Sequence, residues 1–294
     1  MNRRDPRGGM ILVSVLWSIA LMTALAWAAS TTFRGLSSVM SVGRDRVKIE
    51  GLLTAGLEAA AGIVKAANAP IPEIETTVNL EAGAVHVRLS DEGGRIDVGN
   101  APLPVLVSLL HAVGAPPAAD VVAQQIVDWR DPERARSADA RLSNASSRNP
   151  SDQAFTDVRQ LANIPGMEPK WVAAMEPLTT VFGSDTVNPL TASAAVIAAL
   201  PGVDPTRLNA FLALRAVPTS DPNSLGAALG PAQAYVKVAP QQAVAVELTA
   251  ELIDGYRDAA RAVIVVLPDD REPYRVLAWD PVSKEPAPRL VEWP

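Results

Sequence analysis

The sequence predicts an α+β fold, in which a long N-terminal helix leads into an antiparallel sheet that carries a large inserted all-helical domain. Two observations predict this fold class. An apolar N-terminal stretch is followed by residues with helical periodicity and no proline, and two regions of strand-like alternation enclose a middle region of helical periodicity. Because side chains repeat every two residues in a strand and about every 3.6 in a helix, the change of period separates the elements.

The N-terminal helix begins in a stretch from Gly8 to Phe33 that contains no charged residue. From Met10 to Ala29 it is almost wholly apolar, and a helix of about 20 residues is long enough to cross the hydrocarbon core of a membrane. Apolar residues then recur at helical spacing as far as Ala67, shortly before Pro70. We therefore expect one continuous helix whose first part, residues 10–33, spans the membrane.

Three kinds of targeting signal begin in this way. A secretory signal would be cut after Ala26-Trp27-Ala28 and would release a soluble protein. A signal anchor would keep the whole stretch, with Arg3, Arg4 and Arg7 held in the cytoplasm by the positive-inside bias. A short basic leader would be cut between Gly9 and Met10, which leaves the helix in the mature chain. Because helical periodicity continues beyond the apolar stretch, we favour a retained helix.

The first strands are predicted between residues 76 and 98, where apolar and polar residues alternate. Val85, Val87 and Leu89 fall on one face, and His86, Arg88 and Ser90 fall on the other. Ala82-Gly83 supplies a turn before them. This region is expected to form a hairpin.

The middle of the chain, residues 101–217, is predicted to be nearly all helical. Helices are expected at 102–113, 117–129, 155–163, 168–176, 193–200 and 204–216. A polar loop, residues 130–153, interrupts them, and a connector at 218–231 contains proline, serine and glycine. Alternation returns at 244–248, 262–267 and 274–279, which predicts further antiparallel strands. Trp129, Trp171 and Trp279 are expected to anchor the core or the sheet.

Composition narrows the classes of function. There are 26 lysines and arginines against 32 aspartates and glutamates, and the net charge of -6 argues mildly against a nucleic-acid partner. The absence of cysteine excludes disulfides and thiol chemistry. His86 and His111 are the only histidines, and no nucleophile elbow accompanies them, so neither a catalytic triad nor a zinc site is indicated. We expect a protein that is not an enzyme.

The polar loop offers a candidate metal site. Calcium takes about 6 to 8 oxygen ligands, and this part of the chain supplies carboxylates at Asp128, Asp131, Glu133 and Asp139. The same loop contains several arginines, among them Arg130 and Arg134. The alternative interpretation is a solvated loop that is cross-linked by arginine-carboxylate pairs.

Two short turns suggest a second kind of site. Ile164-Pro165-Gly166 and Leu200-Pro201-Gly202 each join two helices, as in helix-hairpin-helix modules that hold a phosphate at a helix N-terminus. Such modules add basic residues for affinity. Because only Lys170 and Arg207 follow closely, tight packing turns are the favoured interpretation. The alternative function is a membrane-anchored periplasmic protein that binds nucleic acid.

The short basic leader and the retained apolar helix resemble the class III signal of type IV pilins and pseudopilins. Most such subunits carry glutamate at the fifth residue after the cleavage point, where this chain has Ser14. The K-type minor pseudopilins of type II secretion (the GspK family) lack that glutamate. Blocks similar to theirs follow in order: 94–101, 128–132, 155–167, 187–203 and 274–279.

This resemblance implies a fold and a role. A pilin-like domain is expected from the amphipathic half of the helix and the first strands (34–100), an inserted helical domain (101–217), and a connector with the remaining strands (218–294). The helix would anchor the chain in the bacterial inner membrane, with its N-terminus in the cytoplasm and its globular part in the periplasm. The family binds calcium in the insertion. It also acts at the pseudopilus tip with minor pseudopilins of the I, J and H types, the major pseudopilin, prepilin peptidase and the inner-membrane assembly platform.

Overall fold

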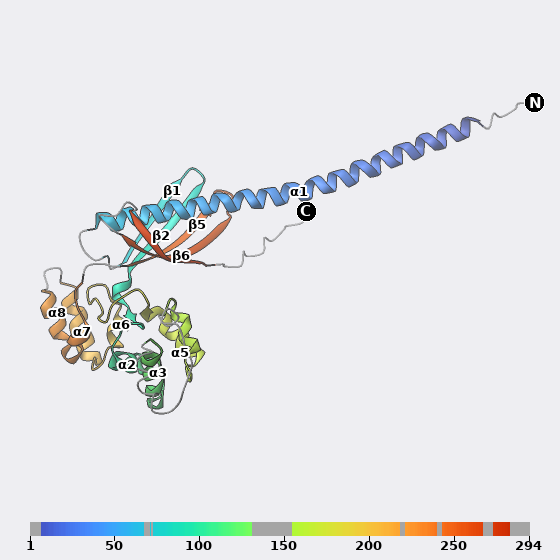
Figure 1. Cartoon of the computed structure of the whole chain (residues 1–294). Helices are drawn as coiled ribbons and strands as arrows, with labels where there is room; N and C mark the ends of the chain where they lie inside the picture. The colour runs from blue at the N-terminus through green and yellow to red at the C-terminus, as the bar shows by residue number, and fades with distance from the viewer. Residues whose placement is uncertain are drawn as a thin grey trace, which may run out of the picture.

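The computed structural model of the chain describes residues 7–67, 71, 73–130, 155–217, 221–239, 243–266 and 273–282. A long helix, α1 (Arg7–Ala66), crosses one face of a sheet and extends far beyond it. Short helices gather on the other side of the sheet, away from the projecting end of α1 (Figure 1). The chain therefore consists of a helix and sheet unit and a separate helical unit.

The helix α1 has 60 residues and is continuous, as the periodicity predicts. At about 1.5 Å per residue it is about 90 Å long. Lys65 lies in its last turn, where a cation interacts favourably with the helix dipole. Among the residues that the structure describes, no helix contains an apolar stretch long enough to cross a membrane.

The main sheet has five antiparallel strands in the order β1-β2-β5-β6-β7. The strands are β1 (Glu73–Leu80), β2 (Gly83–Asp91), β5 (Val244–Leu252), β6 (Arg257–Val266) and β7 (Tyr274–Pro281). The predicted hairpin and the predicted late strands are confirmed. Val85, Val87 and Leu89 are buried, and His86 and Arg88 face solvent on the other side of β2.

Gly56 brings α1 close to the sheet. A β-carbon at this position would lie 2.7 Å from Val85 Cγ1 and 3.1 Å from Leu248 Cδ2, so no larger residue fits without a shift. The core between helix and sheet contains apolar residues of α1, β2, β5 and β6: Ile49, Leu52, Leu53, Leu57, Val85, Val87, Leu89, Val244, Val246, Leu248, Ala262 and Ile264. Burial of this apolar surface holds the second half of α1 in place.

The helical unit lies between β2 and β5 in the sequence. Its helices are η1 (Glu92–Gly94), α2 (Leu103–Ala112), η2 (Pro117–Ala119), α3 (Asp120–Arg130), η4 (Val158–Asn163), α5 (Pro169–Met175), η5 (Glu176–Leu178), α6 (Ala194–Ala198), α7 (Pro205–Arg215), α8 (Pro222–Ala228) and η6 (Gly230–Tyr235). It has its own hydrophobic core, which contains Leu106, Leu110, Ile126, Leu161 and Phe211. The division of the chain into domains stays a prediction, but the two cores are distinct.

Three details differ from the prediction. The inserted segment is not all helical, because β3 (Ile96–Asp97) pairs in parallel with β4 (Thr179–Thr180), whose β-branched side chains are buried. The segment predicted as a helix at 155–163 contains only the 3₁₀ helix η4. The described part of the connector is largely helical, because proline opens α8 rather than breaking a helix and Leu225 and Leu229 are buried.

Candidate functional site

Residues 15–27, in the projecting part of α1, expose apolar side chains around the helix. Trp17 and Trp27 are each 74% exposed. The other exposed apolar residues of this segment are Val15, Leu16, Ile19, Leu21, Met22 and Leu25. Thr23 Oγ1 donates a 2.8 Å hydrogen bond to the Ile19 carbonyl, so its polar group is satisfied within the helix. A helix that is apolar all round requires an apolar environment, either lipid or other helices.

The predicted cleavage residues Gly9 and Met10 lie in the first turns of α1, and Ser14 follows them. The side chains of Met10 and Ser14 fall outside the described residues. Cleavage between Gly9 and Met10, and the meaning of Ser14, therefore stay predictions.

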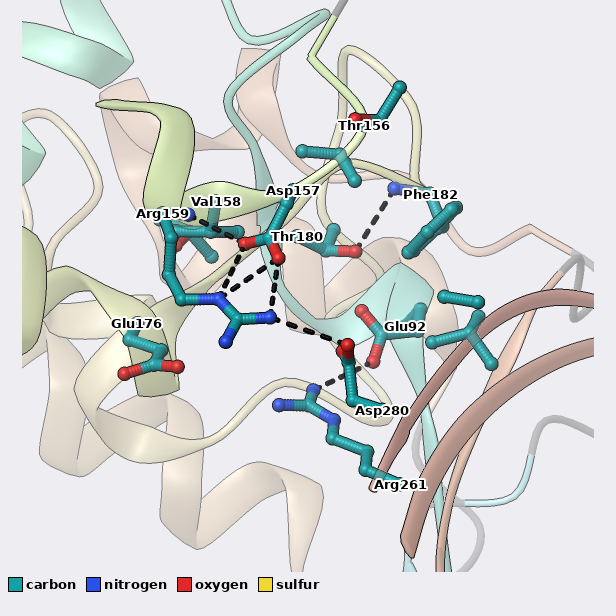
Figure 2. A pocket seen from close by; sticks show the side chains of 14 residues that line it. Glu92, Thr156, Asp157, Val158, Arg159, Glu176, Thr180, Phe182, Arg261 and Asp280 are labelled. Carbon is teal, nitrogen blue, oxygen red and sulfur yellow. Dashed lines mark hydrogen bonds and ion pairs between the residues drawn. The ribbon is translucent and has the colours of Figure 1, made fainter. Parts of the chain in front are cut away.

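A cleft with a volume of about 70 Å³ lies where the helical unit meets β6 and β7. Its charged lining residues are Glu92, Asp157, Arg159, Glu176, Arg261 and Asp280 (Figure 2). Sites for small molecules have volumes of about 300 Å³ or more. The cleft is thus a joint between the two units rather than a binding pocket for an organic ligand.

Arg159 connects the helical unit to the edge of the sheet. Its Nε and Nη2 atoms donate to Asp157 Oδ2 at 2.9 and 2.6 Å, and Nη2 lies 3.4 Å from Asp280 Oδ1 on β7. The hydrogen bond from the Arg159 guanidinium lowers the pKa of the Asp157 carboxyl, against the opposing effect of burial. The same bond raises the pKa of Arg159. Both groups are therefore charged at neutral pH.

Arg261 makes the second connection at this joint. Its Nη2 atom donates to Glu92 Oε1 at 3.4 Å, and Arg95 Nη1 lies 3.7 Å from the same oxygen. Glu92 is only 2% exposed. A buried carboxylate without a partner would be costly, so these two arginines compensate for the burial of Glu92.

The cleft lies at the end of a row of charges that crosses the sheet. Glu75, Arg88, Glu247, Arg261 and Asp280 are consecutive register partners from β1 to β7. Arg88 lies 3.5 Å from Glu75 and 3.7 Å from Glu247. Opposite charges on directly facing residues stabilise a sheet. The face of the sheet opposite α1 is therefore an alternating charged surface.

Two buried aspartates fix the path of the chain after β2. Asp97 accepts hydrogen bonds from Gly99 N at 2.7 Å, Asn100 Nδ2 at 2.9 Å and Gly183 N at 3.0 Å. Asp91 accepts hydrogen bonds from Thr191 Oγ1 at 2.7 Å and Gly93 N at 3.0 Å.

The sequence-based interpretation assigned no role to these two aspartates. The available signal was that each stands two residues before a glycine, which is the pattern of an Asx turn.

Of the predicted calcium ligands, only Asp128 belongs to the described residues, where Gln124 Nε2 donates to its Oδ1 at 2.8 Å. Asp131, Glu133 and Asp139 lie outside them. The described part of the chain contains no cluster of three histidine, aspartate or glutamate residues that could hold a metal ion. Asp128 by itself supplies too few ligands for calcium, which takes about 6 to 8 oxygen atoms. The site stays a prediction.

The two predicted turns pack against the core of the helical unit. Ile164 and Leu200 are buried, and Gly166 and Gly202 have φ values of +79° and +76°, which favour glycine.

The cations beside these turns are both paired with carboxylates. Lys170 Nζ lies 2.7 Å from Glu168, and Arg207 Nε lies 3.3 Å from Asp204. This arrangement is that of packing turns, and it favours no phosphate site.

The histidines belong to different units. His86 Nδ1 on β2 lies 2.9 Å from Thr77 Oγ1, and His111 Nε2 on α2 lies 2.7 Å from Asp120 Oδ1. The structure does not bring the two imidazoles together in one site.

Comparisons with known proteins find one matching family profile and a similar fold. The profile of the family described as "Type II secretion system (T2SS), protein K" matches residues 80–184, which include both buried aspartates and Arg159. The fold is similar to that of a chain in the crystal structure of the GspK-GspI-GspJ complex from the enterotoxigenic Escherichia coli type 2 secretion system. The TM-score is 0.56 at 13% identity, and the match covers 84% of this chain and 99% of that chain. A comparison with curated proteins finds no match.

Proposed function

Because residues 80–184 match the protein K family of the type II secretion system and the fold is similar to that of a chain in a GspK-GspI-GspJ complex, we propose that this chain is a minor pseudopilin that caps the tip of the pseudopilus. In that position it takes part in the export of folded proteins across the outer membrane. The observation that carries the proposal is the exposed apolar surface of residues 15–27 in α1, which requires lipid or other helices around it. The role is one of assembly, and none of its steps requires catalysis.

In this proposal the N-terminal helix has two successive roles. Before assembly, residues 10–33 hold the chain in the inner membrane, and prepilin peptidase removes residues 1–9. After assembly, the same surface packs beside the helices of partner pseudopilins of the I and J types, which is supported by the similar fold found in a GspK-GspI-GspJ complex. Ser14 suits a tip subunit, because an unpaired glutamate in the bilayer would cost about 3 kcal/mol.

The position of the helical unit supports the tip role. It lies on the side of the sheet that faces away from the projecting half of α1 (Figure 1). A further subunit that stacked above this chain would meet the helical unit, so filament growth beyond it is hindered sterically.

The experiment removes the helical unit and keeps the sheet. Asp91 and Val244 are register partners, so an Asn-Gly turn in place of residues 92–243 would join β2 to β5 as an ordinary hairpin. We expect the shortened chain to enter the membrane and to bind its partners but to lose its position at the tip, as measured by cross-linking in cells. A tip complex that formed in the same position without the helical unit would contradict the proposal.

The mass of the mature chain tests separately whether the N-terminal helix is retained after processing. A mature N-terminus at Met10 is expected if the leader is removed by prepilin peptidase. An N-terminus near Ala29 would mean that the helix is lost, and the assembly role would then be wrong.

Calcium binding in the insertion is a separate proposal, supported by the acidic residues between Asp128 and Asp139. Calorimetric titration of the chain with Ca²⁺ should give heat that is reduced by Asp128→Ala. Absence of heat in the unsubstituted chain would reject it.

A further inference from the structure

The two edges of the five-stranded sheet differ in chemistry. On β1, Glu73 and Glu75 face solvent and both form ion pairs with Arg88. On β7, Leu277 is 47% exposed and Val276 and Trp279 are each 43% exposed. Native proteins usually protect a free sheet edge with charged residues. The β1 edge follows that rule, whereas the centre of β7 does not.

The strand order leaves one side of β7 open. β6 pairs with β7 on one side, and β7 is the last strand of the sheet as described. An edge strand presents a row of backbone N–H and C=O groups that another strand can pair with. The charged residues near the ends of β7 are Arg275 and Asp280, and Asp280 is already engaged by Arg159.

A β-bulge decides which way the apolar side chains of β7 point. Ile264 pairs with Val276 and Val263 pairs with Ala278, so Leu277 is the extra residue. Trp279, opposite Ala262, therefore lies on the same face as Val276, which is the face that carries α1.

The helix α1 leaves this face of β7 largely uncovered. It packs mainly on β2, β5 and β6, and Tyr274 Oη at the start of β7 donates a 2.9 Å hydrogen bond to Glu58 of α1. Val276 and Trp279 thus form an exposed apolar patch beside α1. The expectation that Trp279 anchors the sheet is not met, because its side chain is 43% exposed.

We propose that the β7 edge is a docking surface for an extended segment of a partner pseudopilin, which adds to the sheet as a further strand. The inference rests on the proposed function, in which the neighbours of this chain are other pseudopilins. The backbone of the added strand pairs with the open row of β7, and its alternate apolar side chains pack on Val276 and Trp279. A docked helix would cover the side chains but would leave the backbone groups of the edge unpaired.

The test compares one exposed apolar residue at each edge of the sheet. Val276 on β7 and Leu80 on β1 are 43% and 42% exposed, and both are in regular register with the neighbouring strand. The full chain is co-expressed with the I- and J-type pseudopilins of its own system, and the complex is recovered through a tag on the I-type subunit. We expect Val276→Asp to lower recovery at least tenfold, and Leu80→Asp to leave recovery unchanged.

A second measurement identifies the partner element. Hydrogen exchange of residues 273–282 should slow in the complex relative to the isolated full chain, because a paired strand protects backbone amides. Single cysteines at position 277 and on the partners should form cross-links, whereas a cysteine at position 80 should not.

The possible results separate the two proposals. If the unsubstituted chain forms no complex at all, the proposed function fails. If the complex forms and Val276→Asp has no effect, or if β7 amides stay unprotected, only the docking surface is overturned. Cross-links between two copies of this chain, or protection that disappears when residues 283–294 are removed, would also overturn it. Thermal unfolding of the variant shows whether a loss of recovery reflects misfolding.

Discussion

Single buried side chains hold the segment that follows β2 in place. Asp97 is nearly inaccessible to solvent and accepts hydrogen bonds from Gly99, Asn100 and Gly183, so one carboxylate connects β3 to the loop after β4. Such charge-assisted bonds are stronger than neutral ones. A hydropathy pattern does not reveal such residues, because a buried aspartate and an exposed aspartate have the same hydropathy value.

Asp97→Ala should lower the free energy of unfolding by about 3 kcal/mol, because buried N–H donors lose their acceptor. Urea unfolding of the chain in detergent is the measurement. Asp185→Ala, at an exposed position, is the control and should change the free energy by less than about 0.5 kcal/mol. Equal effects of the two substitutions would contradict the role of Asp97.

The pairing of Asp157 with Arg159 predicts a pH dependence. The pKa of Asp157 is lowered in the folded chain, so its contribution to stability is present above the unfolded pKa of about 3.9. It is lost as the pH falls through the folded pKa. We therefore expect Asp157→Asn to show a shallower loss of stability than the unsubstituted chain below about pH 4, as followed by urea unfolding at a series of pH values. Parallel curves would refute this assignment.

At the scale of elements, the closest packing is between α1 and the sheet. Glycines occur along α1, but they serve different purposes: Gly56 faces Val85 at contact distance, whereas a β-carbon on Gly51 or Gly62 would meet nothing within 4 Å. Helix propensity alone treats these positions alike, since glycine costs about 1 kcal/mol relative to alanine at each. Only the packing of the sheet distinguishes them.

Gly56→Ala should therefore destabilise the chain by about 1 kcal/mol, because the added methyl group pushes against β-branched Val85 and this overpacking exceeds the gain in helix propensity. Gly51→Ala and Gly62→Ala are matched controls and should stabilise it by up to about 1 kcal/mol. The midpoint of thermal unfolding, with circular dichroism as the signal, tests all three. A stabilising Gly56→Ala would show that α1 lies farther from the sheet.

At the scale of the whole molecule, two cores are joined by a small polar contact. The helical unit enters from β2 and returns to β5, whose ends are register partners, and the cleft of Figure 2 provides ion pairs between the units. Arg159 and Asp280 are both more than half exposed, and exposed ion pairs contribute only about 0 to 1 kcal/mol. The contact of Arg261 with Glu92 is different, because the carboxylate is buried.

Arg261→Ala should weaken the contact between the two units more than Arg159→Ala does. It leaves the buried Glu92 with Arg95, at 3.7 Å, as its remaining cation. Limited proteolysis at the connections on either side of the helical unit is expected to be faster in Arg261→Ala. Adding Glu92→Gln to Arg261→Ala should restore part of the resistance, because the uncompensated charge is removed. If Arg159→Ala is cleaved as fast as Arg261→Ala, burial of Glu92 is not the decisive factor.

The sequence by itself determined the long helix, the hairpin, the late strands and the order of the family-like blocks, because each depends on local periodicity or on the position of proline and glycine. Only the tertiary structure decided that proline opens α8 and that Thr179 and Thr180 form a strand. It alone also decided that Arg261 pairs with Glu92 and that Asp97 accepts a hydrogen bond from Gly183. The tertiary structure also shows that β7 carries an exposed tryptophan at a sheet edge. These features depend on contacts between residues far apart in the chain, which leave no local pattern in the sequence.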